Sequence, residues 1–218
     1  MSTLEAARVV LLAGPSGSGK SRLAARLQAQ HGWPLVRLDD FYRDEDDPAA
    51  PRSTSLGIVD WDDPASWNEV AAVAALEQLV RTGRTRSPVY DIAASRAVGT
   101  AELTARPTDL ILAEGIFAAE LVGPLRDRGL LREAYVIHRP RILTFALRLV
   151  RDLREHRKPP LLLLRRGLAL LRAEPGIIAA QVAKGCVARS PRDVADELAG
   201  APDLSPSASS GRVDPVRD

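Results

Sequence analysis

The chain of 218 residues suits one domain with a full core, and its 45% hydrophobic and 27% charged residues are typical of a globular protein. A formal net charge of +2 is too small to indicate binding to a nucleic acid polymer or to a membrane surface. One cysteine, Cys186, excludes an intramolecular disulfide and a cysteine metal cluster, and we expect it to be buried or half-buried. The N-terminal residues lack the pattern of a signal peptide, and no apolar run is long enough to span a bilayer, so we expect a cytoplasmic protein.

The first motif in the chain is a glycine-rich octapeptide between a predicted strand, Val9–Ala13, and a helix that continues to about Gln30. It fits the pattern G-x-x-x-x-G-K-[ST] of phosphate-binding loops, with Gly14, Pro15, Ser16, Gly17, Ser18, Gly19, Lys20 and Ser21. Backbone N–H groups and the helix N-terminus would bind the phosphates of ATP, with GTP left open as donor. Lys20 would reach the β- and γ-phosphates, and the Ser21 hydroxyl would bind Mg²⁺.

A second apolar strand, Leu35–Leu38, ends at the aspartates Asp39 and Asp40. At the carboxyl end of a parallel strand, Asp39 would face the nucleotide, close to the Mg²⁺. There it could orient an acceptor hydroxyl and take its proton during phosphoryl transfer. The alternative is that one of these aspartates only caps a turn, and spacing does not choose between the two roles.

The middle of the chain continues the alternation of helix and strand. A helix is predicted from Pro64 to about Arg81 and ends at Gly83, and extended segments are predicted at 88–91 and 100–104. Two continuous apolar runs, at 110–113 and 134–137, are typical of buried parallel strands. This order predicts an α/β fold, a mainly parallel sheet flanked by helices, with ligands at the carboxyl ends of the strands.

Glu114 directly follows the apolar run 110–113. A carboxylate at the end of a buried strand can hold the hydration shell of Mg²⁺ beside Ser21. The alternative is a glutamate that caps a helix or forms an ion pair.

From Pro140 onward the sequence is helical in character. Arginines follow one another along the first segment, which we interpret either as a cationic lid or as a solvated helix face. Leucine-rich helices follow at 161–172, with shorter ones at 177–183 and 191–198, and residues 200–218 have the composition of a disordered tail. We expect the leucines to pack on the core or to form a homo-oligomer interface, the alternative being a docking surface for a partner protein.

Several separated segments resemble the uridine kinase family of P-loop kinases, in the order that the family has them. The stronger matches are the octapeptide 14–21, the box Asp39-x-Phe41-Tyr42-Arg43, the box Pro88-Val89-Tyr90-Asp91, and Glu114-Gly115-Ile116. Weaker matches are Asp62-Asp63-Pro64 and Arg148-x-x-Arg151-Asp152. The likeness implies a P-loop kinase domain over 1–199, with a lid at about 139–160, C-terminal helices at about 161–199 and a tail from 200.

The resemblance also implies roles for the matching residues. Asp39 would act as general base on the 5′-hydroxyl of a nucleoside such as uridine or cytidine, and Asp62 would bind the ribose hydroxyls. Tyr42 and Tyr90 would line the acceptor pocket. The lid would supply Arg148 to the acceptor, Arg151 to the reacting phosphate and Arg157 to the triphosphate.

One departure from the family concerns the acceptor. Where family members have a histidine that contacts the pyrimidine, the nearest counterpart in this chain is Ser95, which cannot stack on a base. The acceptor could therefore be another small alcohol, such as pantothenate, glycerate or a sugar phosphate. A rival of a different class is a nucleotide-binding regulatory protein without catalysis.

Overall fold

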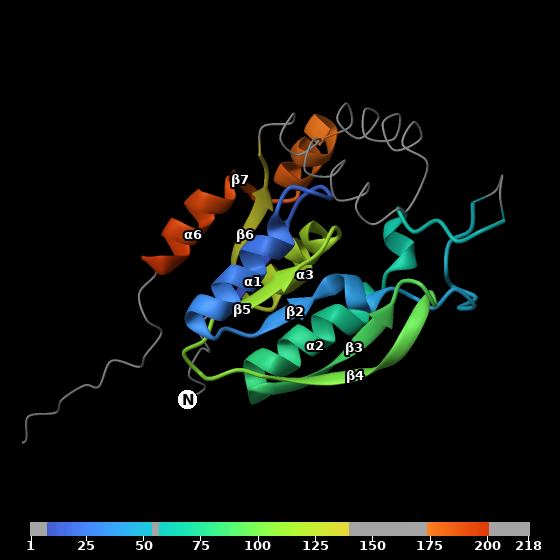
Figure 1. The fold of residues 1–218 in the computed structure, drawn as a ribbon, viewed down its shortest axis with the longest axis horizontal. Coiled ribbons are helices and arrows are strands. Elements are labelled where there is room, and N and C mark those ends of the chain that lie inside the picture. The colour runs from blue at the N-terminus through green and yellow to red at the C-terminus, as the bar shows by residue number, and fades with distance from the viewer. Residues whose placement is uncertain (1–7, 54–56, 140–173, 201–218) are drawn as a thin grey trace, which may run out of the picture.

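The computed structural model describes residues 8–53, 57–139 and 174–200. Five parallel strands form the central sheet in the order β2-β5-β1-β6-β7 (Figure 1). Their bounds are Val9–Ala13 for β1, Leu35–Arg37 for β2, Ile111–Glu114 for β5, Leu131–Ile137 for β6 and Val187–Arg189 for β7. The predicted fold class, a mainly parallel sheet flanked by helices, is confirmed.

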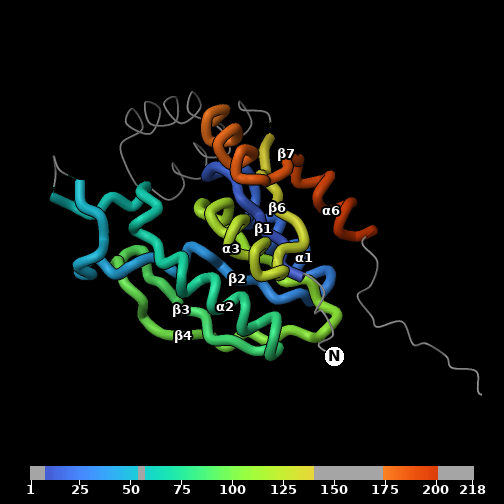
Figure 2. Tube along the Cα trace, turned by 180° about the vertical axis from the view of Figure 1, so that it is seen from behind, coloured from blue at the N-terminus to red at the C-terminus, as the bar shows by residue number. Residues whose placement is uncertain are grey.

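Alternate residues of β1 face the two sides of the sheet, and each side has its own core. On one side, Val10 and Leu12 pack with α1 (Lys20–His31) and α6 (Pro191–Ala199). On the other side, Val9 and Leu11 pack with α2 (Glu69–Thr82) and α3 (Val122–Asp127), which can be followed in Figure 2. All five residues of β1 are buried, which holds the loop that follows Ala13 on a rigid support.

The second helix begins later than its sequence predicts. Pro64–Ser66 form a single 3₁₀ turn, and α2 begins at Glu69, where the Asn68 side chain accepts a hydrogen bond from the N–H of Ala71. The break is fixed by Trp67, whose buried indole N–H donates to the carbonyl of Leu38 at 2.6 Å. The predicted end is confirmed, because Gly83 closes the helix with a left-handed backbone conformation.

The two extended segments predicted in the middle of the chain are one long antiparallel ribbon. β3 (Arg84–Asp91) and β4 (Arg96–Thr104) pair with each other and lie outside the central sheet, alongside α2 (Figure 1). The N–H of Ala97 donates to Asp44, and the N–H of Glu45 donates to the carbonyl of Ser95. The tip of the ribbon is therefore tied to the segment that follows β2.

The two helices predicted at 177–183 and 191–198 are confirmed, the first of them beginning earlier, at residue 174. Residues 174–183 are helical, α6 begins at Pro191 behind a Ser190 capping box, and Cys186 is buried. Strand β7 and the helix α3 have no counterpart among the predicted elements. The helices expected at 140–173 and the tail beyond Gly200 lie outside the described residues. Within the described ranges, no helix has the length and apolar character needed to cross a membrane.

Candidate functional site

The octapeptide 14–21 joins β1 to α1 at the carboxyl end of the sheet. Gly14 has a φ of 135°, and a Cβ there would lie only 2.6 Å from the carbonyl oxygen of Ile137 at the end of β6. Gly19 has a φ of 95° and leads directly into the first turn of α1. The glycines thus let the backbone wrap closely at a helix N-terminus, which is the geometry of a phosphate-binding loop.

Lys20 and Ser21 begin α1, and both lie beside Glu114 at the end of β5. The Ser21 hydroxyl donates to Oε2 of Glu114 at 3.0 Å, and Lys20 is only 6% exposed. Glu114 is 4% exposed, and this desolvation raises the pKa of its carboxyl, although the nearby Lys20 acts in the opposite direction. The predicted pair Ser21 and Glu114 is brought together by the parallel pairing of β1 with β5.

A hydroxyl and a carboxylate that share a hydrogen bond form an oxygen donor set suited to Mg²⁺. No group of three or more His, Cys, Asp or Glu side chains that could hold a metal occurs among the described residues. Mg²⁺ commonly takes one or two protein oxygens, and completes its shell with water and substrate phosphate. The residues present therefore fit an ion that arrives with the nucleotide.

Replacing Glu114 by glutamine is expected to raise the Mg²⁺ concentration needed for activity by about 10- to 100-fold. The same change should raise the melting temperature of the ligand-free protein at neutral pH. Because the pKa of Glu114 is raised in the folded state, the ionised carboxylate costs stability above that pKa, and the cost disappears as the pH falls through it. Thermal unfolding from pH 7 down to pH 4 should therefore show the two proteins converging.

The matched control for this variant is Glu77→Gln on α2, where the carboxylate lies at the surface in ion pairs with Arg81 and Arg128. It should leave the Mg²⁺ requirement close to that of the wild type. Equal Mg²⁺ requirements for Glu114→Gln and the wild type would contradict the metal assignment.

Asp39 lies in a 3₁₀ turn, Leu38–Phe41, directly beyond β2. The predicted strand is one residue too long, because Leu38 already belongs to this turn. Oδ1 of Asp39 accepts a hydrogen bond from the N–H of Ile116 at 3.2 Å, just after the end of β5. The charge of Asp39 acts on both Glu114 and Tyr42, raising the pKa of each. Asp39 thus lies between the candidate Mg²⁺ ligand and the residues predicted to hold the acceptor.

Asp40 has a different set of contacts. Its Oδ1 accepts from the N–H of Tyr90 at 3.4 Å, and its Oδ2 lies 3.9 Å from Nε of Arg37. Asp40 therefore ties the 3₁₀ turn to the β3–β4 ribbon. From the sequence, either aspartate could have been the residue that only caps a turn. The geometry favours Asp39 as the candidate base and Asp40 as the residue that stabilises the turn.

Gly115 lets Asp39 approach the end of β5. A Cβ on Gly115 would lie 2.8 Å from Oδ1 of Asp39 and 2.8 Å from Cβ of Leu38. Gly115→Ala is therefore expected to displace the 3₁₀ turn and to lower kcat/KM by about 10-fold or more, since small misplacements of reacting groups are costly. The measurement is steady-state kinetics beside thermal unfolding.

Gly123→Ala is the matched control, because a Cβ on this glycine of α3 would meet nothing within 4 Å. It should leave kcat/KM unchanged and keep or raise the stability, since alanine favours a helix. If the two alanine variants have the same kcat/KM, the close approach at Gly115 does not position Asp39.

Four aromatic side chains form a cluster next to Asp39. The Tyr42 ring lies 5.6 Å from Trp61, 5.9 Å from Tyr90 and 6.0 Å from Phe117, measured between ring centroids. Burial raises the pKa of Tyr42, and the charges of Asp39 and Asp62 raise it further. Burial also raises the pKa of Tyr90 to about 12, so both phenols are neutral at physiological pH.

Two of the predicted acceptor residues, Tyr42 and Tyr90, are held in place through their hydroxyl groups. The hydroxyl of Tyr42 donates to the carbonyl of Trp61 at 3.3 Å, and that of Tyr90 donates to the carbonyl of Arg43 at 3.0 Å. Asp62 is exposed at the edge of this cluster. Ser95 lies in the turn of the β3–β4 ribbon with a φ of 51°, and its carbonyl, not its side chain, binds the neighbouring segment.

Two side chains at the site were not predicted. Trp61 precedes the aspartate box at 62–64, and its aromatic character next to a predicted sugar-binding residue was a usable signal. Arg139 lies two residues beyond β6 and belongs to no motif. Arg148, Arg151 and Arg157, predicted to form a lid, lie outside the described residues.

Comparisons with known proteins agree with this geometry. Residues 9–106 match a family described as an AAA domain. The uridine kinase of Brevibacillus brevis is 26% identical over 147 residues, which are 66% of this chain and 65% of that protein. The inorganic pyrophosphatase TTM2 of Arabidopsis thaliana is 31% identical over 123 residues, 55% of this chain but 17% of that protein. The chain thus spans less than two thirds of the length of either relative.

The structural comparison concerns the fold alone. A protein from Silicibacter sp. TM1040, described as a fructose transport system kinase, aligns with a TM-score of 0.57 at 23% identity, covering 80% of this chain and 85% of that protein. The resemblance found in the sequence motifs is thus confirmed as a similarity: the chain is similar to a uridine kinase over 66% of its length, and its fold is similar to that of a solved kinase structure.

Proposed function

We propose that the chain transfers the γ-phosphate of Mg²⁺·ATP to a hydroxyl of a small molecule, with a nucleoside such as uridine or cytidine as the first candidate. The observation that carries the proposal is the position of Asp39. The carboxylate of Asp39 lies between the buried carboxylate of Glu114, on the side of the phosphate loop, and the aromatic cluster around Tyr42 on the other side. A protein that only bound nucleotide would not need a base held beside a second pocket.

The residues divide the reaction between them. Lys20 and the N–H groups of the loop bind the phosphates and neutralise charge on the transferred group, while Ser21 and Glu114 hold the metal. When bound there, Mg²⁺ would neutralise negative charge on the phosphates. Asp39 accepts the proton of the acceptor hydroxyl while the oxygen of that hydroxyl forms a bond to the γ-phosphorus. The bond between the γ-phosphorus and the β–γ bridging oxygen breaks, and ADP leaves.

The acceptor side supports a nucleoside for two reasons. Tyr42, Trp61 and Tyr90 offer aromatic surface against which a planar base can pack. Asp62, at the edge of that surface, can accept hydrogen bonds from ribose hydroxyls. Ser95 supports the alternative acceptors, because no histidine stands where the family reads a pyrimidine.

The test is ADP release from Mg²⁺·ATP with a panel of acceptors: uridine, cytidine, purine nucleosides, pantothenate, glycerate and sugar phosphates. Turnover with uridine or cytidine supports a nucleoside kinase. Turnover with a different alcohol keeps the reaction and changes the substrate. ATP binding without acceptor-dependent release from any of these compounds would argue for the regulatory rival.

Other expectations stay predictions. These are the roles of Arg148, Arg151 and Arg157 in the lid, the extent of the kinase domain over 1–199, assembly into a homo-oligomer, and a cytoplasmic location.

A further inference from the structure

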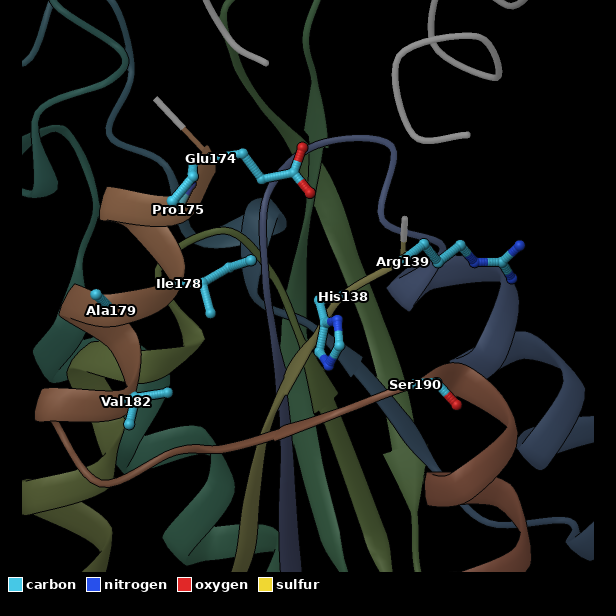
Figure 3. A pocket seen from close by; sticks show the side chains of 8 residues that line it. All are labelled: His138, Arg139, Glu174, Pro175, Ile178, Ala179, Val182 and Ser190. Carbon is cyan, nitrogen blue, oxygen red and sulfur yellow. The ribbon is translucent and has the colours of Figure 1, made fainter. Parts of the chain in front are cut away.

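Arg139 reaches back from the end of β6 to the phosphate-binding loop. A Cβ on Gly19 would lie 3.1 Å from Nε and 3.1 Å from Nη2 of Arg139, so the guanidinium covers the last glycine of the loop. Figure 3 shows the Arg139 side chain extending from its strand over the start of α1, at the rim of a cavity of about 690 Å³. The guanidinium therefore lies against the last glycine of the proposed phosphate-binding loop.

The guanidinium of Arg139 lies close to other positive charge. The N-terminus of α1 carries a partial positive charge, and Lys20 is buried in its first turn. Within the described residues, the buried Nε of Arg139 makes no hydrogen bond. The acidic residue of the same cavity, Glu174, belongs to the helix at 174–183 on its other side (Figure 3). An arginine packed on a positive helix end, with an unused donor, indicates a site that an anion completes.

The side of the loop on which Arg139 lies indicates which phosphates it can contact. Glu114 and Asp39 approach the loop from β5 and β2, whereas Arg139 approaches from β6, on the other side of β1. Because the acceptor must meet the γ-phosphate beside Asp39, Arg139 faces the part of the triphosphate that does not react. Its effect is therefore expected in binding of the donor and not in the chemical step.

We propose that Arg139 is a phosphate-binding residue for the donor nucleotide, contacting the phosphates that remain in ADP. The proposal rests on the nucleotide site proposed above. It assigns the β6 side of the loop a cation of its own, separate from Lys20 and from the arginines at 148, 151 and 157.

The test compares the affinities of the wild type, Arg139→Gln and Arg139→Lys for ADP and for inorganic pyrophosphate, by isothermal titration calorimetry. Arg139→Gln should weaken both about 10-fold or more, because a hydrogen-bonded charge pair with phosphate is lost. Arg139→Lys should recover part of the affinity. In steady-state kinetics, KM for ATP should rise while kcat at saturating ATP stays close to that of the wild type.

Arg132→Gln is the matched control, an arginine of the same strand seven residues earlier and so at its opposite end. Thermal unfolding without ligand identifies any variant that has lost its fold. If Arg139→Gln is unfolded, the affinities of Arg139→Lys are compared with those of the wild type instead. Unchanged affinities in Arg139→Gln overturn the proposal. Weaker ADP binding with unchanged pyrophosphate binding also overturns it, because the side chain would then contact the base.

The outcome also separates this proposal from the proposed function. If the wild type binds neither ligand, both proposals fail together. If ADP binding is lost in Lys20→Ala but kept in Arg139→Gln, the nucleotide site stands and the role of Arg139 alone is contradicted.

Discussion

Replacing Asp39 by asparagine is expected to lower turnover by about 10²-fold or more while ATP affinity stays close to that of the wild type. The carboxamide keeps the shape of the side chain and can still accept the hydrogen bond from the N–H of Ile116, so the 3₁₀ turn should hold. What is lost is the proton acceptor for the attacking hydroxyl, and general bases contribute effects of this size. Steady-state turnover and calorimetric titration with ATP measure the two quantities separately.

Asp40→Asn provides the matched control, because it makes the same chemical change one residue away. Asp40 contacts the N–H of Tyr90 and Arg37 and is not next to Ile116. Its variant should keep most of the turnover. Similar losses in both variants would mean that this pair of aspartates supports the turn, and near-normal turnover in Asp39→Asn would remove the residue from the mechanism.

Replacing Lys20 by alanine is expected to weaken ATP binding and to lower turnover together, each by about 10²-fold or more. Lys20 is buried at the first residue of α1, next to Glu114, where no other described lysine can replace it. Its charge interacts with the phosphates in the ground state, and more strongly as charge develops on the transferred group. Both the dissociation constant for ATP and kcat should therefore change. Calorimetry with ATP, followed by kinetics at saturating acceptor, gives the two effects.

Lys184→Ala is the control for charge removal elsewhere, since Lys184 forms an ion pair with Glu120 away from the loop. It should leave both constants near those of the wild type. A Lys20→Ala variant that binds ATP normally would contradict the phosphate-binding assignment of the octapeptide.

The parts of the fold that the sequence predicts well are those encoded by neighbouring residues. The strand at 9–13, the glycine loop and the helix behind it follow one another without a gap, so the motif and its structural context agree. Gly83 ends α2 as predicted, because a left-handed cap is a local requirement. The candidate catalytic residues could be predicted for the same reason, since Asp39 and Glu114 come at or just beyond strand ends.

The parts that the sequence predicts poorly depend on distant contacts. Pro64 is compatible with the start of a helix, but the hydrogen bond from Trp67 to the carbonyl of Leu38 delays α2 until Glu69. β7 has only three residues and forms because it pairs with β6. No pattern in the neighbouring sequence predicts this pairing. The position of Arg139 beside the loop likewise depends on how β6 packs, and its neighbours in sequence do not predict it.

The ribbon of β3 and β4 has a consequence for how acceptor choice can change. It lies outside the central sheet, and with the segment after β2 it supplies most of the aromatic surface, while the phosphate loop is held by β1 between β5 and β6. Mutations at the tip of the ribbon, around Tyr90, are therefore expected to reshape the proposed acceptor pocket without disturbing the strands that hold the loop. Such an arrangement separates the proposed acceptor side of the molecule from the proposed phosphate-binding side, and makes the ribbon a target for directed evolution of new acceptors.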